Sequence, residues 1–214
     1  MENLTIKKNA IISIINNEEG LYYGNLRYYF REVFQAPNAR NPYHNFRHSV
    51  YVFCQVYEGG RYENLNKADM RALLIAALFH DYGHSGRIGQ DREEIKNTIK
   101  SLSLIILNGD DHLWHDIRDL IESTEWPHPQ DRHVFKSMKI LRDADISQIV
   151  DDVWWQQVIF GLSLEHGVPP ISQLKNEINF LSKLQFESDW GKMVYQPKID
   201  SRIREIEEFL EVLV

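Results

Sequence analysis

The sequence has a single cysteine, Cys54, among 214 residues, which excludes an internal disulfide and a zinc site built from several thiolates. Prolines and glycines are also few, 7 and 11, and none of them gathers into a stretch that would mark a linker. The longest apolar run, around Leu73 to Phe79, is far too short to cross a bilayer. The first twenty residues lack the long apolar core and the small-residue cleavage site of a secretion signal. We therefore expect a soluble, cytoplasmic protein that has no membrane partner.

The charge balance argues against a nucleic-acid or anionic-membrane partner. The chain has 24 Lys and Arg against 31 Asp and Glu, a formal net charge of −7. A net-negative protein is a poor candidate for nonspecific binding to nucleic acids or anionic membranes, so we expect no nucleic-acid partner. The hydrophobic share of 43% is typical of a folded globular protein, and the sequence contains neither a repeat nor a linker. These features predict one domain that spans residues 1–214.

Helical periodicity dominates the chain. In the C-terminal segment Ile199, Ile203, Ile206 and Leu210 recur at steps of three and four, which indicates an amphipathic helix. The segment 67–79 is apolar on nearly all sides, as expected of a helix at the centre of a helical domain. Strands of period two are absent, so the predicted class is all-α, a compact bundle of many helices. Besides these two, helices are expected near residues 3–16, 23–35, 45–58, 91–107, 111–123, 148–163 and 171–185.

Histidines and carboxylates gather in two short segments. His44 and His48 are four residues apart, which places both imidazoles on one face if the segment is helical. His80 and Asp81 stand where the most apolar helix ends, although burial of an unpaired carboxylate there would be costly. A divalent cation removes this cost by binding both groups, and a set of imidazole and carboxylate ligands suits Zn, Fe, Mn or Mg. The other histidines of interest are expected to be solvent-exposed or capping groups: His112, His115, His133 and His166.

Four elements of the sequence resemble a known enzyme family. They are YHNFRHSVYV at 43–52, FHDYGHSG at 79–86, TEW at 124–126 and ADIS at 144–147. The ordered set H…HD…D is the signature of the HD superfamily of metal-dependent phosphohydrolases. The flanking residues are similar to those of the catalytic domain of class I 3′,5′-cyclic nucleotide phosphodiesterases. The resemblance extends over roughly residues 40–190 and implies an HD-type, all-helical phosphodiesterase-like fold.

The resemblance also implies a role for individual residues. In such an enzyme two divalent metal ions hold a bridging hydroxide that attacks phosphorus, and a histidine protonates the leaving oxygen. Asp81 would touch both ions, and His44 would be the general acid. The implied set is His48, His80, Asp81 and Asp145 as metal ligands, His84, Thr124 and Glu125 as groups that orient the metal-bound waters, and Tyr43, Asn45 and Phe186 as substrate contacts. Asp143, two residues before Asp145, is expected to be a helix cap or an ion-pair partner.

The sequence departs from the family pattern mainly where the substrate base would bind. The family glutamine that precedes the base-stacking phenylalanine by about three residues corresponds to Lys183 here. The second acidic residue of the H-D-x-D-H element is Gly83, and the asparagine after it is replaced by Gly89 or Gln90. We therefore expect the metal chemistry to be preserved, whereas a standard adenine or guanine pocket is not predicted.

The most favoured function is a metal-dependent hydrolase of 3′,5′-cyclic nucleotides that acts on a small-molecule nucleotide. One alternative is an HD nucleotidase that cleaves a phosphomonoester, for which a proton donor at His44 would be optional. Another is a catalytically silent metal-binding module, which would typically have lost a ligand or the acid. The sequence leaves the metal identity, the base and the oligomeric state open.

Overall fold

The computed structural model describes residues 11–16, 26–106, 109–128 and 134–213. Within these ranges the chain is helical and contains no strand, which confirms the predicted all-α class. The helices are α2 (Leu26–Phe34), α3 (Phe46–Tyr62), α4 (Lys67–Phe79), α5 (Asp91–Ile105), α6 (Trp114–Glu122), α7 (Lys136–Ile146), α8 (Phe160–His166), α9 (Pro170–Leu181), α10 (Asp189–Val194) and α11 (Ile199–Leu213). No helix of this described part is both long and apolar enough to cross a membrane.

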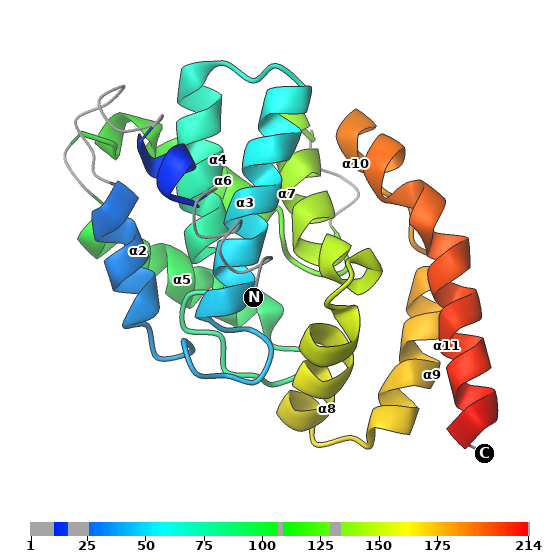
Figure 1. Cartoon of the computed structure of the whole chain (residues 1–214). Helices are drawn as coiled ribbons and strands as arrows, with labels where there is room; N and C mark the ends of the chain where they lie inside the picture. The colour runs from blue at the N-terminus through cyan, green and yellow to red at the C-terminus, as the bar shows by residue number, and fades with distance from the viewer. Residues whose placement is uncertain (1–10, 17–25, 107–108, 129–133, 214) are drawn as a thin grey trace.

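Helix α4 forms the centre of the molecule, as its uniformly apolar sequence predicts. Every residue from Met70 to Phe79 is buried, including Arg71, whose guanidinium pairs with Asp110. Helices α2, α3, α6 and α7 all pack against α4 (Figure 1). Burial on all sides holds the end of α4 rigidly in the interior, which is where His80 and Asp81 follow.

The start of α3 is fixed by Asn45. Its side-chain oxygen accepts hydrogen bonds from the backbone N–H groups of Arg47 and His48, the usual role of an N-cap residue. Its amide nitrogen donates to the carbonyls of Asn41 and Pro42, at 2.7 and 3.1 Å. The cap therefore sets the direction in which the chain enters α3 and the positions of His44 and His48 on either side.

The C-terminal half of the chain covers one side of this centre. Helix α8 follows a π-helical turn at Trp155–Ile159, and α9 and α11 then run side by side (Figure 1). Helix α8 lies close to the loop before α3, because a Cβ at Gly161 would come within 3.1 Å of the Pro42 carbonyl and 3.2 Å of the Tyr43 Cβ. This close approach brings the C-terminal end of α8 next to His44.

Several predicted boundaries differ from the structure. Helices α7 and α10 were not predicted, and only the end of the expected helix 148–163 is α-helical, since residues 147–150 form a 3₁₀ turn. Helix α9 ends at Leu181 rather than at residue 185. Residues 11–16 of the first expected helix are helical, and 3–10 lie outside the described residues. Helix α7 was missed because its buried face includes Arg142 and Asp143, which interrupt the apolar periodicity.

Candidate active site

The four predicted metal ligands converge although they are far apart in sequence. His48 comes from the first turn of α3, His80 and Asp81 from the end of α4, and Asp145 from the last turn of α7. One ligand atom from each lies within 4.8 Å of the others. The Nε2 atom of His48 is 3.3 Å from Nε2 of His80 and 2.9 Å from Oδ1 of Asp145. Nε2 of His80 is 3.1 Å from Oδ2 of Asp81.

Hydrogen bonds on the far side of each ring orient the two histidines. Nδ1 of His80 lies 2.9 Å from the carbonyl oxygen of Ala77, and Nδ1 of His48 lies 3.2 Å from Oε1 of Gln148. Both partners are acceptors, so each Nδ1 carries the proton and donates it. With a metal bound, the Nε2 lone pairs would face the shared centre, which is the arrangement that metal-binding histidines require.

The electrostatics of this cluster fit a divalent cation. Oδ2 of Asp81 is buried, and its contacts with Nε2 of His80 at 3.1 Å and of His48 at 3.4 Å are ion-pair contacts without hydrogen-bond geometry. Burial opposes ionisation of Asp81 and Asp145, but the neighbouring imidazoles, His80 foremost, hold the pKa of both carboxyls well below its ordinary value. Two partly buried carboxylates and two buried imidazoles form a donor set that a divalent transition metal or Mg²⁺ would satisfy. The residues present therefore fit the expected metal.

His44 lies beside this cluster and is paired with Glu165 at the end of α8. Its Nδ1 contacts Oε1 of Glu165, and Oε2 of the same carboxylate accepts hydrogen bonds from the backbone N–H of Tyr43 at 2.8 Å and of His44 at 3.1 Å. Burial disfavours the imidazolium, but the carboxylates of Asp81, Glu165 and Asp145 together raise the pKa of His44 above its ordinary value. The acceptor at Nδ1 leaves Nε2 available to a substrate.

His84 stacks on His44 and is held by a glutamate of its own. The ring centroids of His44 and His84 are 3.8 Å apart at an angle of 23°. Nδ1 of His84 accepts the backbone N–H of Gly86, so the proton resides on Nε2, which faces Oε2 of Glu94 at 3.0 Å. Burial, followed by the charge of His44, lowers the pKa of His84. A neutral His84 can lie flat against a protonated His44 without charge repulsion.

A buried asparagine joins the two histidine segments. Nδ2 of Asn38 donates to the carbonyls of His44 and Asp81, at 3.0 and 2.7 Å, and its Oδ1 accepts the N–H of Gly83. Gly83 has φ +82°, a left-handed conformation that favours glycine over the acidic residue of the family pattern. The loop before α3 and the loop after α4 are thus fixed to each other at the site.

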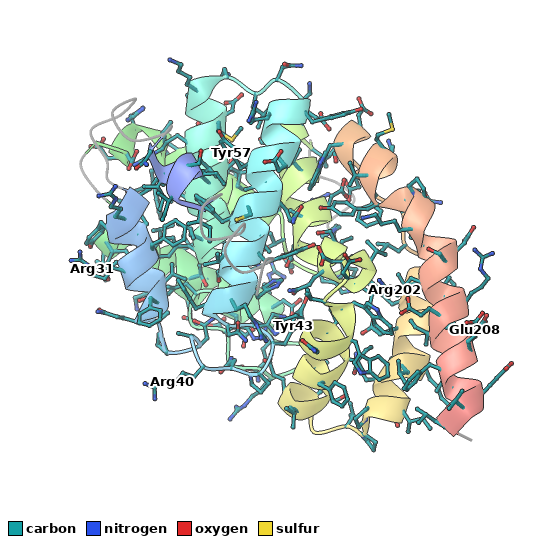
Figure 2. All side chains as sticks on the ribbon, in the orientation of Figure 1. Arg31, Arg40, Tyr43, Tyr57, Arg202 and Glu208 are labelled. Carbon is teal, nitrogen blue, oxygen red and sulfur yellow. The ribbon has the colours of Figure 1, made fainter. Side chains whose placement is uncertain are left out.

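The site opens on a cavity of about 600 Å³. Of the residues predicted from the sequence, Tyr43, His44, His80, Asp81, His84, Thr124 and Asp145 line it. Figure 2 shows Tyr43 near the N-terminal end of α3. The far wall is formed by apolar and aromatic side chains, among them Trp126 and Phe180, whose ring centroids are 5.7 Å apart.

Three of the expected roles are not supported by this geometry. Phe186 is 1% exposed, packs against Tyr195 in the core and does not line the cavity, which corrects its expected role as a substrate contact. Phe180 lines the cavity instead. Asn45 is likewise the cap of α3 rather than a substrate contact, because its amide is fully used by the backbone. Glu125 is partly exposed and is not among the residues that line the cavity.

Asp143 has a structural role, but it is a hydrogen-bond acceptor in a tertiary contact rather than the helix cap or ion-pair partner that was expected. It accepts hydrogen bonds from the backbone N–H groups of Glu187 and Ser188 and from the Ser188 hydroxyl. Burial raises its pKa to about 6. It therefore fixes the segment before α10 and faces away from the ligand cluster.

Residues 43–90 match the profile of the 3′5′-cyclic nucleotide phosphodiesterase family. The match covers the His44–His48 and His80–His84 segments, whereas Asp145 and Glu165 lie beyond it. It supports a class I cyclic nucleotide phosphodiesterase-like domain and a metal-dependent phosphodiesterase-like hydrolase. No curated protein matches the chain significantly.

Proposed function

We propose that this protein hydrolyses 3′,5′-cyclic nucleotides, with His44 as the general acid and with divalent cations held by His48, His80, Asp81 and Asp145. The observation that carries the proposal is that His44, which is paired with Glu165, lines the same cavity as the cluster residues His80, Asp81 and Asp145. A metal-binding module has no need of a histidine whose pKa is raised and whose second nitrogen is free. A phosphodiesterase needs both features, because the alkoxide that leaves phosphorus is a poor leaving group.

The proton on His44 has a defined route in this proposal. Nδ1–H is held by Glu165, so the imidazolium would donate its other proton, at Nε2, to the departing 3′ oxygen. The negative charge of Glu165 stabilises the imidazolium before the reaction and fixes the plane of the ring. The stacked ring of His84 limits rotation of His44 further.

Asp81 is shared between two groups of possible ligands. One is the four-residue cluster, and the other consists of Asp81, His44 and His84. We propose that Asp81 would help to hold an ion in each group, and that His84 and Thr124 would orient metal-bound water. When bound, divalent cations supply an activated water and neutralise charge on the phosphoryl oxygens. Zn, Fe, Mn and Mg are all compatible with imidazole and carboxylate ligands.

Replacement of His44 by Ala tests the proposed acid. The variant is expected to retain its metals, while turnover of a cyclic nucleotide falls by roughly 10²–10⁴-fold, the usual contribution of a positioned acid. The loss should be smaller on bis(p-nitrophenyl) phosphate, because p-nitrophenolate leaves without protonation. The measurements are steady-state rates on both substrates and metal content by mass spectrometry.

His115→Ala is the matched control, since this histidine is exposed on α6. It should leave both rates unchanged. Equal losses on both substrates in His44→Ala would contradict the acid role, and loss of metal would make His44 a ligand. A wild-type protein that cleaves only nucleoside monophosphates would instead be the phosphomonoesterase of the alternative interpretation.

A further inference from the structure

The wall of the cavity formed by α9 has a polar centre that the proposed chemistry does not use. Gln173, Asn176 and Glu177 line the cavity, and Phe180 follows on the same face of the helix. Glu177 is 6% exposed, so its carboxyl group is largely removed from bulk water. A buried carboxyl group beside an open cavity is costly unless a ligand or a neighbour satisfies it.

The neighbour that Glu177 has is a hydrogen-bond donor. Nε2 of Gln173, one turn earlier, donates to Oε1 of Glu177 at 2.6 Å. In this bond Glu177 is the acceptor and the side-chain amide nitrogen of Gln173 is the donor. The side-chain carbonyl oxygen of Gln173 is left to accept a hydrogen bond from a ligand. Burial raises the pKa of Glu177 to about 7, because this single amide only partly offsets the lost hydration. Burial is the main cause of the raised pKa of the Tyr43 phenol, and after Asp145 and Asp81 the carboxylate of Glu177 contributes to it as well.

We propose, on the basis of the function proposed above, that Glu177 selects a nucleobase that presents two adjacent N–H donors, as guanine does. The Watson–Crick edge of guanine carries N1–H beside the N2 amino group, and a carboxylate can accept both. The same edge of adenine places the N1 lone pair beside the N6 amino group, so a carboxylate gains one hydrogen bond there and is repelled by the lone pair. The acceptor pair of Glu177 and Gln173 therefore favours guanine.

The aromatic residues beside Glu177 suit a flat ligand. Phe180 lies three residues further along α9, and its ring is 5.7 Å from that of Trp126. Stacking on aromatic side chains holds a base with little preference for its identity. In this cavity the stacking residues would supply affinity, while Glu177 would supply the discrimination between bases.

The first test compares three cyclic substrates. Wild-type protein should have its highest kcat/KM on cyclic GMP, a lower value on cyclic IMP, which lacks the N2 amino group, and the lowest on cyclic AMP. In Glu177→Gln the ratio of cyclic GMP to cyclic AMP should fall by roughly tenfold or more, because a charge-assisted hydrogen bond is lost and an amide can also pair with adenine. The exposed Glu208 of α11, labelled in Figure 2, provides the control Glu208→Gln, which should keep the wild-type ratio.

A second readout is independent of hydrolysis. Calorimetric titration of the chelator-treated protein with GMP, IMP and AMP should give affinities in that order, and Glu177→Gln should remove most of the difference. Selective binding of GMP without hydrolysis of any cyclic nucleotide would support the base preference and refute the proposed function. Hydrolysis with equal or greater preference for the adenine nucleotide in the wild type would refute the base preference alone. The order of the wild-type affinities and kcat/KM values tests the base preference even if Glu177→Gln is unstable.

Discussion

At the scale of single residues, Glu165 is one of three carboxylates, with Asp81 and Asp145, that raise the pKa of His44. Burial disfavours the imidazolium, and the nearby carboxylates more than compensate. Glu165 is the carboxylate that contacts the ring directly, and its own pKa is held below the ordinary value by His44 and by two backbone N–H groups. The residue is therefore a positioning group that also supplies half of an ion pair.

Replacement of Glu165 by Gln should move the pH profile of turnover. A general acid must be protonated, so activity falls as pH rises through the pKa of His44. Because Glu165 raises that pKa, its neutral replacement lowers the pKa, and the alkaline limb of the profile should shift to lower pH. The measurement is kcat/KM on a cyclic nucleotide between pH 5 and 10.

The shift separates an electrostatic role from a purely structural one. A loss of rate by the same factor at every pH would contradict the electrostatic role, since it would mean that Glu165 only shapes the site. Metal content should equal that of the wild type, because Glu165 is not in the four-ligand cluster. The control Glu208→Gln changes the charge equally at an exposed position and should leave the profile in place.

Sequence patterns locate the proposed metal ligands but not the residues that orient the histidines of the site. His48, His80, Asp81 and Asp145 stand in short ordered motifs, and the structure brings them together. Glu165 and Gln148 stand 121 and 100 residues from the histidines that they contact, and no local pattern marks them. The expectation that Phe186 contacts the base followed motif spacing alone. The structure places Phe186 in the core beyond the end of α9, and Phe180 of α9 lines the cavity instead.

At the scale of elements, α10 is joined to α7 through Asp143. Ser188 caps α10 by accepting the N–H of Gly191, and the same hydroxyl donates to Asp143. Gly191 packs so closely on Asp143 that a Cβ at this position would collide with Oδ2 of the carboxylate. The absence of a side chain at residue 191 therefore allows α10 to approach the helix that carries Asp145.

Gly191→Ala should destabilise the protein. Alanine is the better helix former by about 1 kcal/mol, but the collision involves a buried carboxylate that hydrogen bonds to residues 187 and 188 hold in place. Overpacking of this kind typically costs about 1–3 kcal/mol, so the clash should outweigh the gain in helix propensity. The free energy of unfolding from urea titration measures the net effect.

The neighbouring Lys192 is exposed on the same helix, and Lys192→Ala is the matched control. It changes helix propensity without a clash and should leave the free energy of unfolding within about 0.5 kcal/mol of the wild type. A Gly191→Ala variant as stable as this control would contradict the close packing of α10 on α7. Prediction of this contact from sequence was not feasible, because neither helix has a strong apolar stripe.

At the scale of the whole molecule, the residues proposed as metal ligands connect the central helices. The cluster joins the start of α3, the end of α4 and the end of α7, which also pack on one another. The all-α class could be predicted from periodicity, and the central position of α4 from its apolar sequence. The packing of α8 against the loop before α3 could not be predicted, since it depends on the small size of Gly161 and on contacts between distant segments.

A cation at this junction should therefore stabilise the entire fold. A ligand that binds only the folded state adds about 2.7 kcal/mol when its concentration is 100 times Kd, which for a chain of this length raises Tm by roughly 5–10 °C. Differential scanning calorimetry of chelator-treated protein, with and without added Zn²⁺ or Mn²⁺, measures this shift.

Asp81→Ala removes the carboxylate shared by both ligand groups, so the metal should no longer raise its Tm. An equal rise in wild type and Asp81→Ala would place the stabilising ion elsewhere. No rise in the wild type would contradict a metal centre among these helices.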